Sequence, residues 1–220
     1  MTVHGRRETH PVREAPRVRD MPAPRRSESA AGGAMQRLFA WPYRGILAFL
    51  LWTGIRPWQL SLLSLGLTAV TGLLIVTGQW LAAGIVLIFA GACDVFDGSV
   101  ARHRGEAGRS GAFIDSVLDR VSDMILFSCL FWRLAADGHT VEAALALVTL
   151  VVSLAVSHLR AEAEAAGVTL SEGLFQRLER VLALIVGLLI PGAMLPVLVA
   201  LSVLGVITLL QRVSLALRGA

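Results

Sequence analysis

The chain has 220 residues, a length that suits one domain, and its formal net charge is +4. Hydrophobic residues make up 55% of it and the mean hydropathy is +0.67, which excludes an ordinary soluble domain and indicates an integral membrane protein. The basic residues lie at the ends of apolar segments instead of forming one patch, so membrane topology explains them better than nucleic-acid binding does.

The first part of the chain differs in composition from the rest. Residues 1–33 are rich in Arg, Pro, Glu and Ser and nearly free of large apolar side chains, so we predict a disordered cytoplasmic tail. Residues 34–56 mix aromatic and leucine side chains with Arg37 and Arg44, which is typical of a juxtamembrane amphipathic helix that lies in the membrane interface. Pro57 then separates this helix from the first span.

Six apolar segments follow within residues 57–220, each close to the roughly 20 residues that a bilayer crossing needs. They predict an all-α integral membrane domain of six transmembrane helices, near residues 58–78, 80–101, 112–132, 140–160, 178–192 and 194–211. The fifth is short unless its helix continues back into the charged residues before it.

The arginines predict the orientation of these spans. If the N-terminus is cytoplasmic, the connections 102–111 and 160–177 and the C-terminal end carry most arginines of the membrane domain, while the outer loops keep only Arg133. By the positive-inside rule, we expect both termini on the cytoplasmic side of the cell membrane.

The stretch DVFDGSVARHRGEAGRSGAFIDSVLD, residues 94–119, places four aspartates at the end of one predicted span and the start of the next. Helical spacing puts two sets of residues on one face each. The first helix carries Asp94, Asp97, Gly98 and Ala101, and the second carries Asp115, Asp119 and Asp123. The short connection predicts antiparallel neighbours with both carboxylate faces near the cytoplasmic boundary. We interpret Asp123, one turn deeper, as structural.

Four carboxylates this close repel one another at low dielectric, so they require protonation, arginine partners or divalent cations. Oxygen ligands favour hard cations, with Mg²⁺ or Mn²⁺ ahead of Zn²⁺. Two such ions bridged by shared carboxylates would form a clamp suited to diphosphate chemistry. Gly98 and Ala101 leave the backbone bare beside the metals, which makes room for a flat or bulky group.

The pattern Asp94-x2-Asp97-Gly98-x2-Ala101-Arg102-x8-Gly111-x3-Asp115-x3-Asp119 resembles the signature of the CDP-alcohol phosphotransferase family at every defined position. The resemblance implies a membrane enzyme that moves a phosphatidyl group from CDP-diacylglycerol to a polar alcohol and releases CMP, and a homodimer is common in this kind of family. It implies that four aspartates, Asp94, Asp97, Asp115 and Asp119, ligate the metals and that Asp119 is also the general base. It further implies that Gly98, Ala101 and Arg102 border the cytidine diphosphate and that Gly111 allows the helices to pack closely.

The acceptor is addressed by residues 157–181. Arg160, Arg177 and Arg180 are expected at cytoplasmic helix ends, where they could bind a phosphate on the acceptor; the alternative is membrane anchoring and pairing with nearby glutamates. This segment resembles the phosphatidylinositol phosphate synthase branch of the family, which implies inositol phosphate. Glu162 departs from that branch, where a second basic residue is expected, so glycerol 3-phosphate or another polar alcohol stays open as the acceptor.

Two other classes of function were weighed. A cation transporter would also use intramembrane carboxylates, but it predicts acidic residues at mid-bilayer depth and polar groups continuing to the outer face. Here the carboxylates cluster towards one side of the membrane. A non-catalytic membrane scaffold would have no use for four costly aspartates, so the sequence favours the enzyme.

Overall fold

The computed structural model describes residues 30–106, 108–166 and 177–219, with side chains from residue 42 to residue 215 in these ranges. Within them the chain is all-α, as predicted. The helices are α1 (Ala30–Thr53), α2 (Pro57–Val76), α3 (Trp80–Arg104), α4 (Arg109–Ala136), α5 (Thr140–Ala165), α6 (Arg177–Leu189) and α7 (Met194–Gly219).

Each of the six apolar segments forms a helix that starts close to its predicted position. Several helices run on past the predicted ends, because a helix satisfies its own backbone hydrogen bonds in water as well as in lipid. The N-terminal helix α1 begins at Ala30, four residues inside the segment predicted as a tail, and it includes Pro42. The rest of that predicted tail, residues 1–29, lies outside the described residues.

Among the described helices, four are long and apolar enough to cross a membrane: α2, α3, α5 and the Met194–Leu215 part of α7. The long helix α4 carries five charged side chains between its start and its middle, namely Arg109, Asp115, Asp119, Arg120 and Asp123. Helix α6 has 13 residues, and at a rise of about 1.5 Å per residue it is only about 20 Å long.

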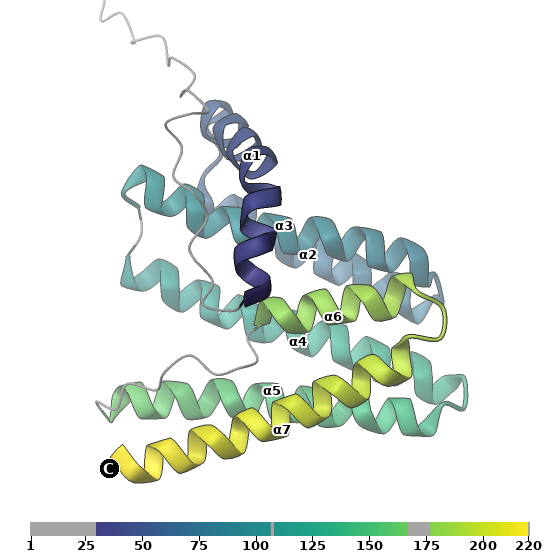
Figure 1. Cartoon of the computed structure of the whole chain (residues 1–220). Helices are drawn as coiled ribbons and strands as arrows, with labels where there is room; N and C mark the ends of the chain where they lie inside the picture. Colours follow the sequence, from purple (N-terminus) through teal and green to yellow (C-terminus); the bar gives the residue numbers. More distant parts are fainter. Residues whose placement is uncertain (1–29, 107, 167–176, 220) are drawn as a thin grey trace, which may run out of the picture.

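Helices α2 to α7 run side by side as a bundle, and α1 crosses one end of it steeply (Figure 1). Helix α2 packs on α3 and α4, α5 packs on α4 and α7, and α6 joins α3 to α7. The prediction that α3 and α4 are direct neighbours is wrong: they run antiparallel, but these two described helices do not pack on each other. Spacing along one helix predicts which residues share a face, and it does not predict which helix packs on that face.

Two buried apolar clusters hold the bundle. The larger takes a side chain from each of α2 to α7, for example Ile75, Leu87, Phe127, Ala146, Leu184 and Leu201. The smaller, which includes Leu47, Leu60, Phe96 and Val100, fixes α1 onto α2 and α3. Many large apolar side chains on the outside are exposed, as expected where lipid surrounds the bundle.

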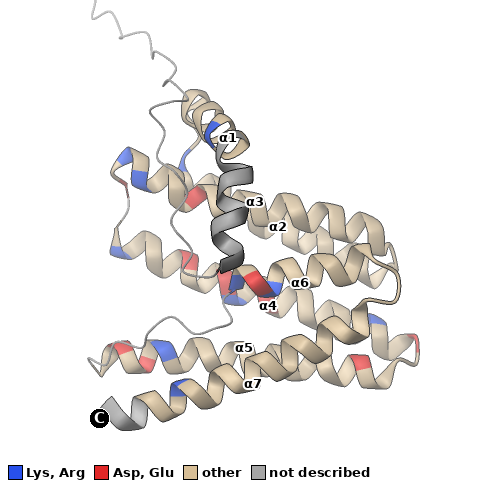
Figure 2. Ribbon diagram, in the orientation of Figure 1, with Lys and Arg blue, Asp and Glu red and all other residues tan. Residues whose placement is uncertain are grey.

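The charged side chains gather at one end of the bundle, where α3 ends, α4 begins, and α5 and α7 end (Figure 2). The opposite end holds a small group that includes the Arg133–Asp137 ion pair, at 2.8 Å. The middle of the helices is almost free of charge on the described residues, apart from a group around the start of α6. This asymmetry is the one that the arginine pattern predicts.

Candidate active site

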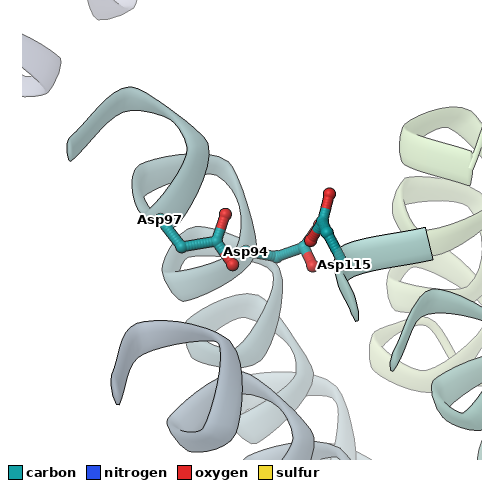
Figure 3. A group of neighbouring side chains, drawn as sticks. All are labelled: Asp94, Asp97 and Asp115. Atoms are coloured by element: carbon teal, nitrogen blue, oxygen red, sulfur yellow. The ribbon is translucent and has the colours of Figure 1, made fainter. Parts of the chain in front are cut away.

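Three of the four signature aspartates come together between α3 and α4. Asp94 and Asp97 project from α3 and Asp115 from α4, and each places one carboxylate oxygen within 4.8 Å of the other two (Figure 3). Asp97 is buried, Asp94 is half-buried and Asp115 is exposed. The cluster is therefore anchored on the α3 side and open on the α4 side.

The turn between the two helices explains how their aspartates come together. Helix α3 ends at Gly105, which has a left-handed backbone with a φ of 70°, a conformation that glycine adopts without steric cost. Helix α4 begins four residues later at Arg109. This short connection returns the chain to the same end of the bundle (Figure 1), so carboxylates of both helices can come together.

Asp97 is held by a residue that the sequence analysis missed. The Ser61 hydroxyl of α2 donates a hydrogen bond to Asp97 Oδ2 at 2.7 Å, and the Gly98 N–H donates to Asp97 Oδ1. Ser61 belongs to a stripe of small polar residues at helical spacing on α2: Ser61, Ser64, Thr68 and Thr71. Such a stripe in an apolar helix is the signal that would have revealed it.

Asp119, the predicted general base, lies outside the group of three and is bound by Arg177. Arg177 is the first described residue of α6, and its Nη1 lies 2.9 Å from Asp119 Oδ1 and also contacts Asp94 Oδ2. Burial opposes the charge of the guanidinium, but the two carboxylates that it contacts stabilise that charge. Arg177 therefore stays charged and joins α6 to both aspartate helices.

The other two predicted acceptor arginines also have carboxylate partners. Arg180 Nη2 donates to Asp123 Oδ2 at 2.7 Å, and both side chains are buried. Arg160 pairs with Glu164 at 2.8 Å at an exposed position on α5. The structural interpretation of Asp123 agrees with this geometry, because the carboxylate also accepts a 2.6 Å hydrogen bond from Ser153.

A cavity of about 510 Å³ opens from the α4 aspartates and is lined by α4, α5, α6 and α7. Five of the lining residues are arginines: Arg120, Arg160, Arg177, Arg180 and Arg212. Three of them, Arg177, Arg180 and Arg212, carry a buried Nε without a hydrogen-bond partner among the described residues. The lining also includes the carboxylates of Asp115, Asp119, Asp123 and Glu164, so the cavity has a small excess of basic groups and lies next to the acidic cluster.

Arg212 lies in the C-terminal end, whose arginines were used only to predict the orientation of the spans. It is buried on α7, where one guanidinium nitrogen approaches the Val156 carbonyl at 3.4 Å. The signal that could have identified it is its position in an apolar helix. A charged side chain there is energetically costly, and such residues are therefore candidates for a functional role.

The residues expected to border the cytidine diphosphate lie on α3, the helix that also carries Asp94 and Asp97. A Cβ built at Gly98 would come within 3.2 Å of Arg102 Nη1, so the guanidinium covers that glycine. Arg102 Nη2 donates to Ser99 Oγ at 3.1 Å, and the Tyr43 hydroxyl of α1 donates to the same oxygen at 2.6 Å. Tyr43, which the sequence analysis did not single out, also stacks on Phe96 with ring centroids 5.1 Å apart.

The two remaining signature residues are small. Ala101 is half-buried on α3, one turn after Gly98. A Cβ at Gly111 would meet nothing within 4 Å, so the expected close helix packing at Gly111 is wrong for the described residues. The close approach occurs elsewhere: a Cβ at Gly84 would lie 2.6 Å from Leu189 Cδ2, where α3 passes the end of α6.

Comparison with known proteins matches this arrangement to a family. A family model described as CDP-alcohol phosphatidyltransferase matches residues 55–216. The chain belongs to the CDP-alcohol phosphatidyltransferase family. The prediction of an enzyme of this class is confirmed, and the transporter and scaffold alternatives are set aside.

Members of the CDP-alcohol phosphatidyltransferase family similar to this chain include a phosphatidylinositol phosphate synthase from Corynebacterium glutamicum. It is 35% identical over 170 residues, which cover 74% of this chain and 78% of the relative. The solved phosphatidylinositol phosphate synthase of Mycobacterium tuberculosis with CDP-DAG bound superposes with a TM-score of 0.71 at 30% identity, covering 78% of this chain and 92% of that one. The same enzyme in complex with manganese and citrate gives a TM-score of 0.68 at 30% identity, covering 78% and 87%.

The side chains present in this CDP-alcohol phosphatidyltransferase fit a divalent cation. The cluster of Asp94, Asp97 and Asp115 offers only carboxylate oxygens within 4.8 Å of one another, which is the donor set that Mg²⁺ and Mn²⁺ prefer. Ser61 fixes one of these carboxylates through a hydrogen bond, as outer partners of metal ligands do.

Proposed function

We propose that this protein is a phosphatidylinositol phosphate synthase, which transfers the phosphatidyl group of CDP-diacylglycerol to inositol phosphate and releases CMP. The observation that carries the proposal is the basic cavity of about 510 Å³ that opens directly from Asp115 and Asp119. An acceptor held there by its phosphate would have its hydroxyl beside the carboxylates. The similar proteins from Corynebacterium glutamicum and Mycobacterium tuberculosis are phosphatidylinositol phosphate synthases, which supports the same acceptor.

The arginines favour a phosphorylated acceptor over a neutral alcohol. Guanidinium groups bind phosphate oxygens through charge-assisted, often bidentate hydrogen bonds. A buried donor without a partner costs about 1–3 kcal/mol, and the Nε groups of Arg177, Arg180 and Arg212 are three such donors among the described residues. A phosphate in the cavity would satisfy them.

Glu162, the departure from the branch pattern, does not oppose this acceptor. Its side chain is 67% exposed, and among the described residues it is not part of the cavity lining. The glutamate that does line the cavity is Glu164, which is paired with Arg160. The acceptor proposal therefore stands with a carboxylate at position 162.

We assign roles to the signature residues on the same basis. Asp94, Asp97, Asp115 and Asp119 would hold two divalent cations, Mg²⁺ or Mn²⁺. Such ions, when bound, neutralise the diphosphate of the donor and the charge that builds on departing CMP. Gly98, Ala101 and Arg102 would border the cytidine diphosphate, with Arg102 oriented by Ser99.

Asp119 would act as the general base. Its carboxylate takes the proton of an acceptor hydroxyl while the hydroxyl oxygen attacks the phosphorus that carries diacylglycerol. The bond from that phosphorus to the CMP oxygen breaks, and CMP leaves with the bonding electrons. Asp119 lines the basic cavity, which is where a bound acceptor would present its hydroxyl.

The membrane arrangement is part of the proposal. Helices α2 to α7 would cross the cell membrane six times as one domain over residues 57–220, with α1 in the interface and both termini cytoplasmic. The charged end of the bundle in Figure 2 supports this orientation. The site would then lie at the cytoplasmic boundary, where a lipid donor enters sideways and a polar acceptor arrives from water. A homodimer stays a prediction.

The test is CMP release by the purified protein with CDP-diacylglycerol, Mn²⁺ and one acceptor at a time: inositol phosphate, glycerol 3-phosphate, inositol or serine. We expect inositol phosphate to give the fastest release, with the matching lipid product identified by mass spectrometry. A faster reaction with glycerol 3-phosphate would contradict the acceptor assignment, and no CMP with any acceptor would contradict the reaction.

A matched pair of variants tests the cavity. Arg212→Gln should raise the KM for inositol phosphate by about tenfold or more, as expected for the loss of a charge-assisted phosphate contact, and leave the KM for CDP-diacylglycerol near the wild-type value. Arg133→Gln removes an arginine at the opposite end of the bundle and should change neither constant. An unchanged KM in Arg212→Gln would argue against this cavity as the acceptor site.

A further inference from the structure

We propose that Arg177 couples cation binding to acceptor binding: its guanidinium competes with the divalent cations for Asp94 and Asp119, and once displaced it binds the acceptor phosphate. The inference rests on the proposed function of the site and adds an order to it. It makes the metals the trigger that completes the acceptor pocket.

The first argument is competition for the same oxygens. One nitrogen of Arg177, Nη1, contacts both Asp94 Oδ2 and Asp119 Oδ1. A divalent cation such as Mg²⁺ needs carboxylate oxygens at about 2.1 Å, and a positively charged nitrogen bound to those same oxygens excludes it by volume and by charge. Cation binding by Asp94 and Asp119 therefore requires that Arg177 move away.

The second argument is where the displaced side chain can go. Arg177 and Asp119 line the basic cavity and also a second cavity of about 170 Å³ that contains Asp94. Arg177 thus lies at the boundary between the acidic cluster and the basic space. Rotation about the side-chain bonds of arginine is enough to carry the guanidinium from one to the other, without movement of α6.

The third argument is that the observed pose leaves Arg177 incompletely bonded. Its Nε is buried without a partner among the described residues, and a guanidinium can donate five hydrogen bonds in a fixed fork. A phosphate accepts from such a fork through two parallel hydrogen bonds. Once cations have neutralised the aspartates, the acceptor phosphate therefore makes stronger hydrogen bonds to Arg177 than the aspartates do.

The other cavity arginines are not arranged for this exchange. Arg180 is held by Asp123 and Arg160 by Glu164. Arg120 donates to Ser116 and to the Ser157 carbonyl, and Arg212 contacts the Val156 carbonyl. In the described part of the chain, Arg177 is the cavity arginine that is ion-paired with predicted metal ligands. The coupling should therefore depend on Arg177 and survive changes at Arg160.

The consequence is reciprocal. If Mn²⁺ frees Arg177 for the acceptor, Mn²⁺ tightens acceptor binding, and by linkage the acceptor tightens Mn²⁺ binding by the same factor. Coupling between two sites commonly amounts to roughly 5- to 150-fold in affinity. Removal of Arg177 should abolish most of this coupling and, because the competitor is gone, tighten Mn²⁺ binding when no acceptor is present.

The experiment is titration of the full-length protein in detergent with Mn²⁺, with free Mn²⁺ followed by electron paramagnetic resonance, in the absence and presence of saturating inositol phosphate. For the wild type we expect inositol phosphate to lower the Kd for Mn²⁺ by about fivefold or more. In Arg177→Gln, Mn²⁺ alone should bind more tightly than in the wild type, and the effect of inositol phosphate should fall below about twofold. Arg177→Lys keeps the competing charge and should stay near the wild-type Kd for Mn²⁺ alone.

Arg160→Gln is the matched control, because it removes a cavity arginine that touches no predicted metal ligand. It should weaken inositol phosphate binding while the Kd for Mn²⁺ alone and the coupling factor stay unchanged. Mn²⁺ binding to Arg177→Gln that is equal to or weaker than that of the wild type would overturn the competition. A wild-type coupling factor retained in Arg177→Gln would overturn the transfer of Arg177 to the acceptor.

Two further measurements keep the test decisive. If Arg177→Gln does not fold, the wild type is measured alone. Saturating Mn²⁺ must then lower the Kd for inositol phosphate by the same factor as saturating inositol phosphate lowers the Kd for Mn²⁺. No change in either Kd would overturn the inference. Failure of the proposed function appears separately, as absence of inositol-phosphate-dependent CMP release by the wild type. The Mn²⁺ titration without acceptor tests the competition independently of that result.

Discussion

Replacement of Asp123 by alanine should destabilise the bundle and release Arg180 from its position in the cavity wall. Asp123 Oδ2 accepts hydrogen bonds from Arg180 Nη2 at 2.7 Å and from Ser153 Oγ at 2.6 Å. The Asp123 and Arg180 side chains are only 5% and 11% exposed, so water would not readily replace either partner. The pair ties α4 to α6 and, through Ser153, to α5.

The expected magnitude follows from this burial. Removal of one member of a buried ion pair costs about 3–5 kcal/mol, because the other charge is left without compensation. Arg180→Met should cost a similar amount by stranding the Asp123 carboxylate. In the double variant neither charge remains, so its loss of stability should be smaller than the sum of the single losses by about 2–3 kcal/mol.

The assay is unfolding of the four proteins in mixed micelles of detergent and SDS, together with the KM for inositol phosphate. Asp123→Ala should also raise that KM severalfold, because a freed Arg180 no longer presents its guanidinium in one place. Asp137→Ala removes a partner from the more exposed Arg133 pair at the other end and should cost less than about 1 kcal/mol. Additive single losses, within about 0.5 kcal/mol, would refute the coupled buried pair.

Three further predictions concern residues around the aspartate cluster. Tyr43→Phe keeps the stacking on Phe96 but removes the hydrogen bond to Ser99. We expect the KM for CDP-diacylglycerol to rise about three- to tenfold, in line with about 1 kcal/mol for one hydrogen bond. An unchanged KM would show that Tyr43 does not help to orient Arg102 through Ser99. Ser61→Ala removes a hydrogen bond to the predicted metal ligand Asp97, so it should raise the Mn²⁺ concentration for half-maximal activity about tenfold. The Ser214 hydroxyl donates to the Gln211 carbonyl, and Ser214→Ala should leave that concentration unchanged. Gly84→Ala should destabilise the bundle by about 1–3 kcal/mol, because the added methyl group would collide with Leu189. Gly111→Ala is the control: the added methyl group meets nothing within 4 Å, so this change should be neutral or stabilising. Equal effects of the two changes on stability would contradict the helix contacts described above.

Local patterns predicted the helices well, for a physical reason. An apolar run of about 20 residues is required of any membrane-crossing helix, so the segment that became α2 could be placed before its partners were known. Fixed helical geometry likewise placed Asp94 and Asp97 on one face of α3. The all-α fold and the cluster of Asp94, Asp97 and Asp115 followed from these local rules.

Contacts between distant segments could not be predicted in this way. Arg177 lies 83 residues from Asp94, and its charge suits an acceptor phosphate as well as a carboxylate. Charge alone is compatible with both partners. The packing of α6 against α3 is what places Arg177 next to the carboxylate of Asp94. The same holds for Gly111, whose small size suggests close packing but whose surroundings are open.

Buried polar residues inside apolar helices were the signal left unused. The stripe that includes Ser61 interrupts a segment that was interpreted only as a membrane span, and Arg212 directly follows the predicted end of another span. Each polar group in such a segment needs a partner, and here the partners are a site carboxylate and the cavity wall. Asking for the partner of every such group would have brought both residues into the predicted site.

The most direct test of the central claim is the rate of inositol-phosphate-dependent CMP release by Asp119→Asn, measured beside the wild type and Asp137→Asn, with the lipid product followed by mass spectrometry. Asparagine keeps the size of the side chain but neither ligates a hard cation as well nor accepts the proton. The account predicts a fall of at least about 100-fold, the contribution typical of a general base, with Asp137→Asn near the wild type. Wild-type rates of CMP and phosphatidylinositol phosphate formation in Asp119→Asn would contradict it.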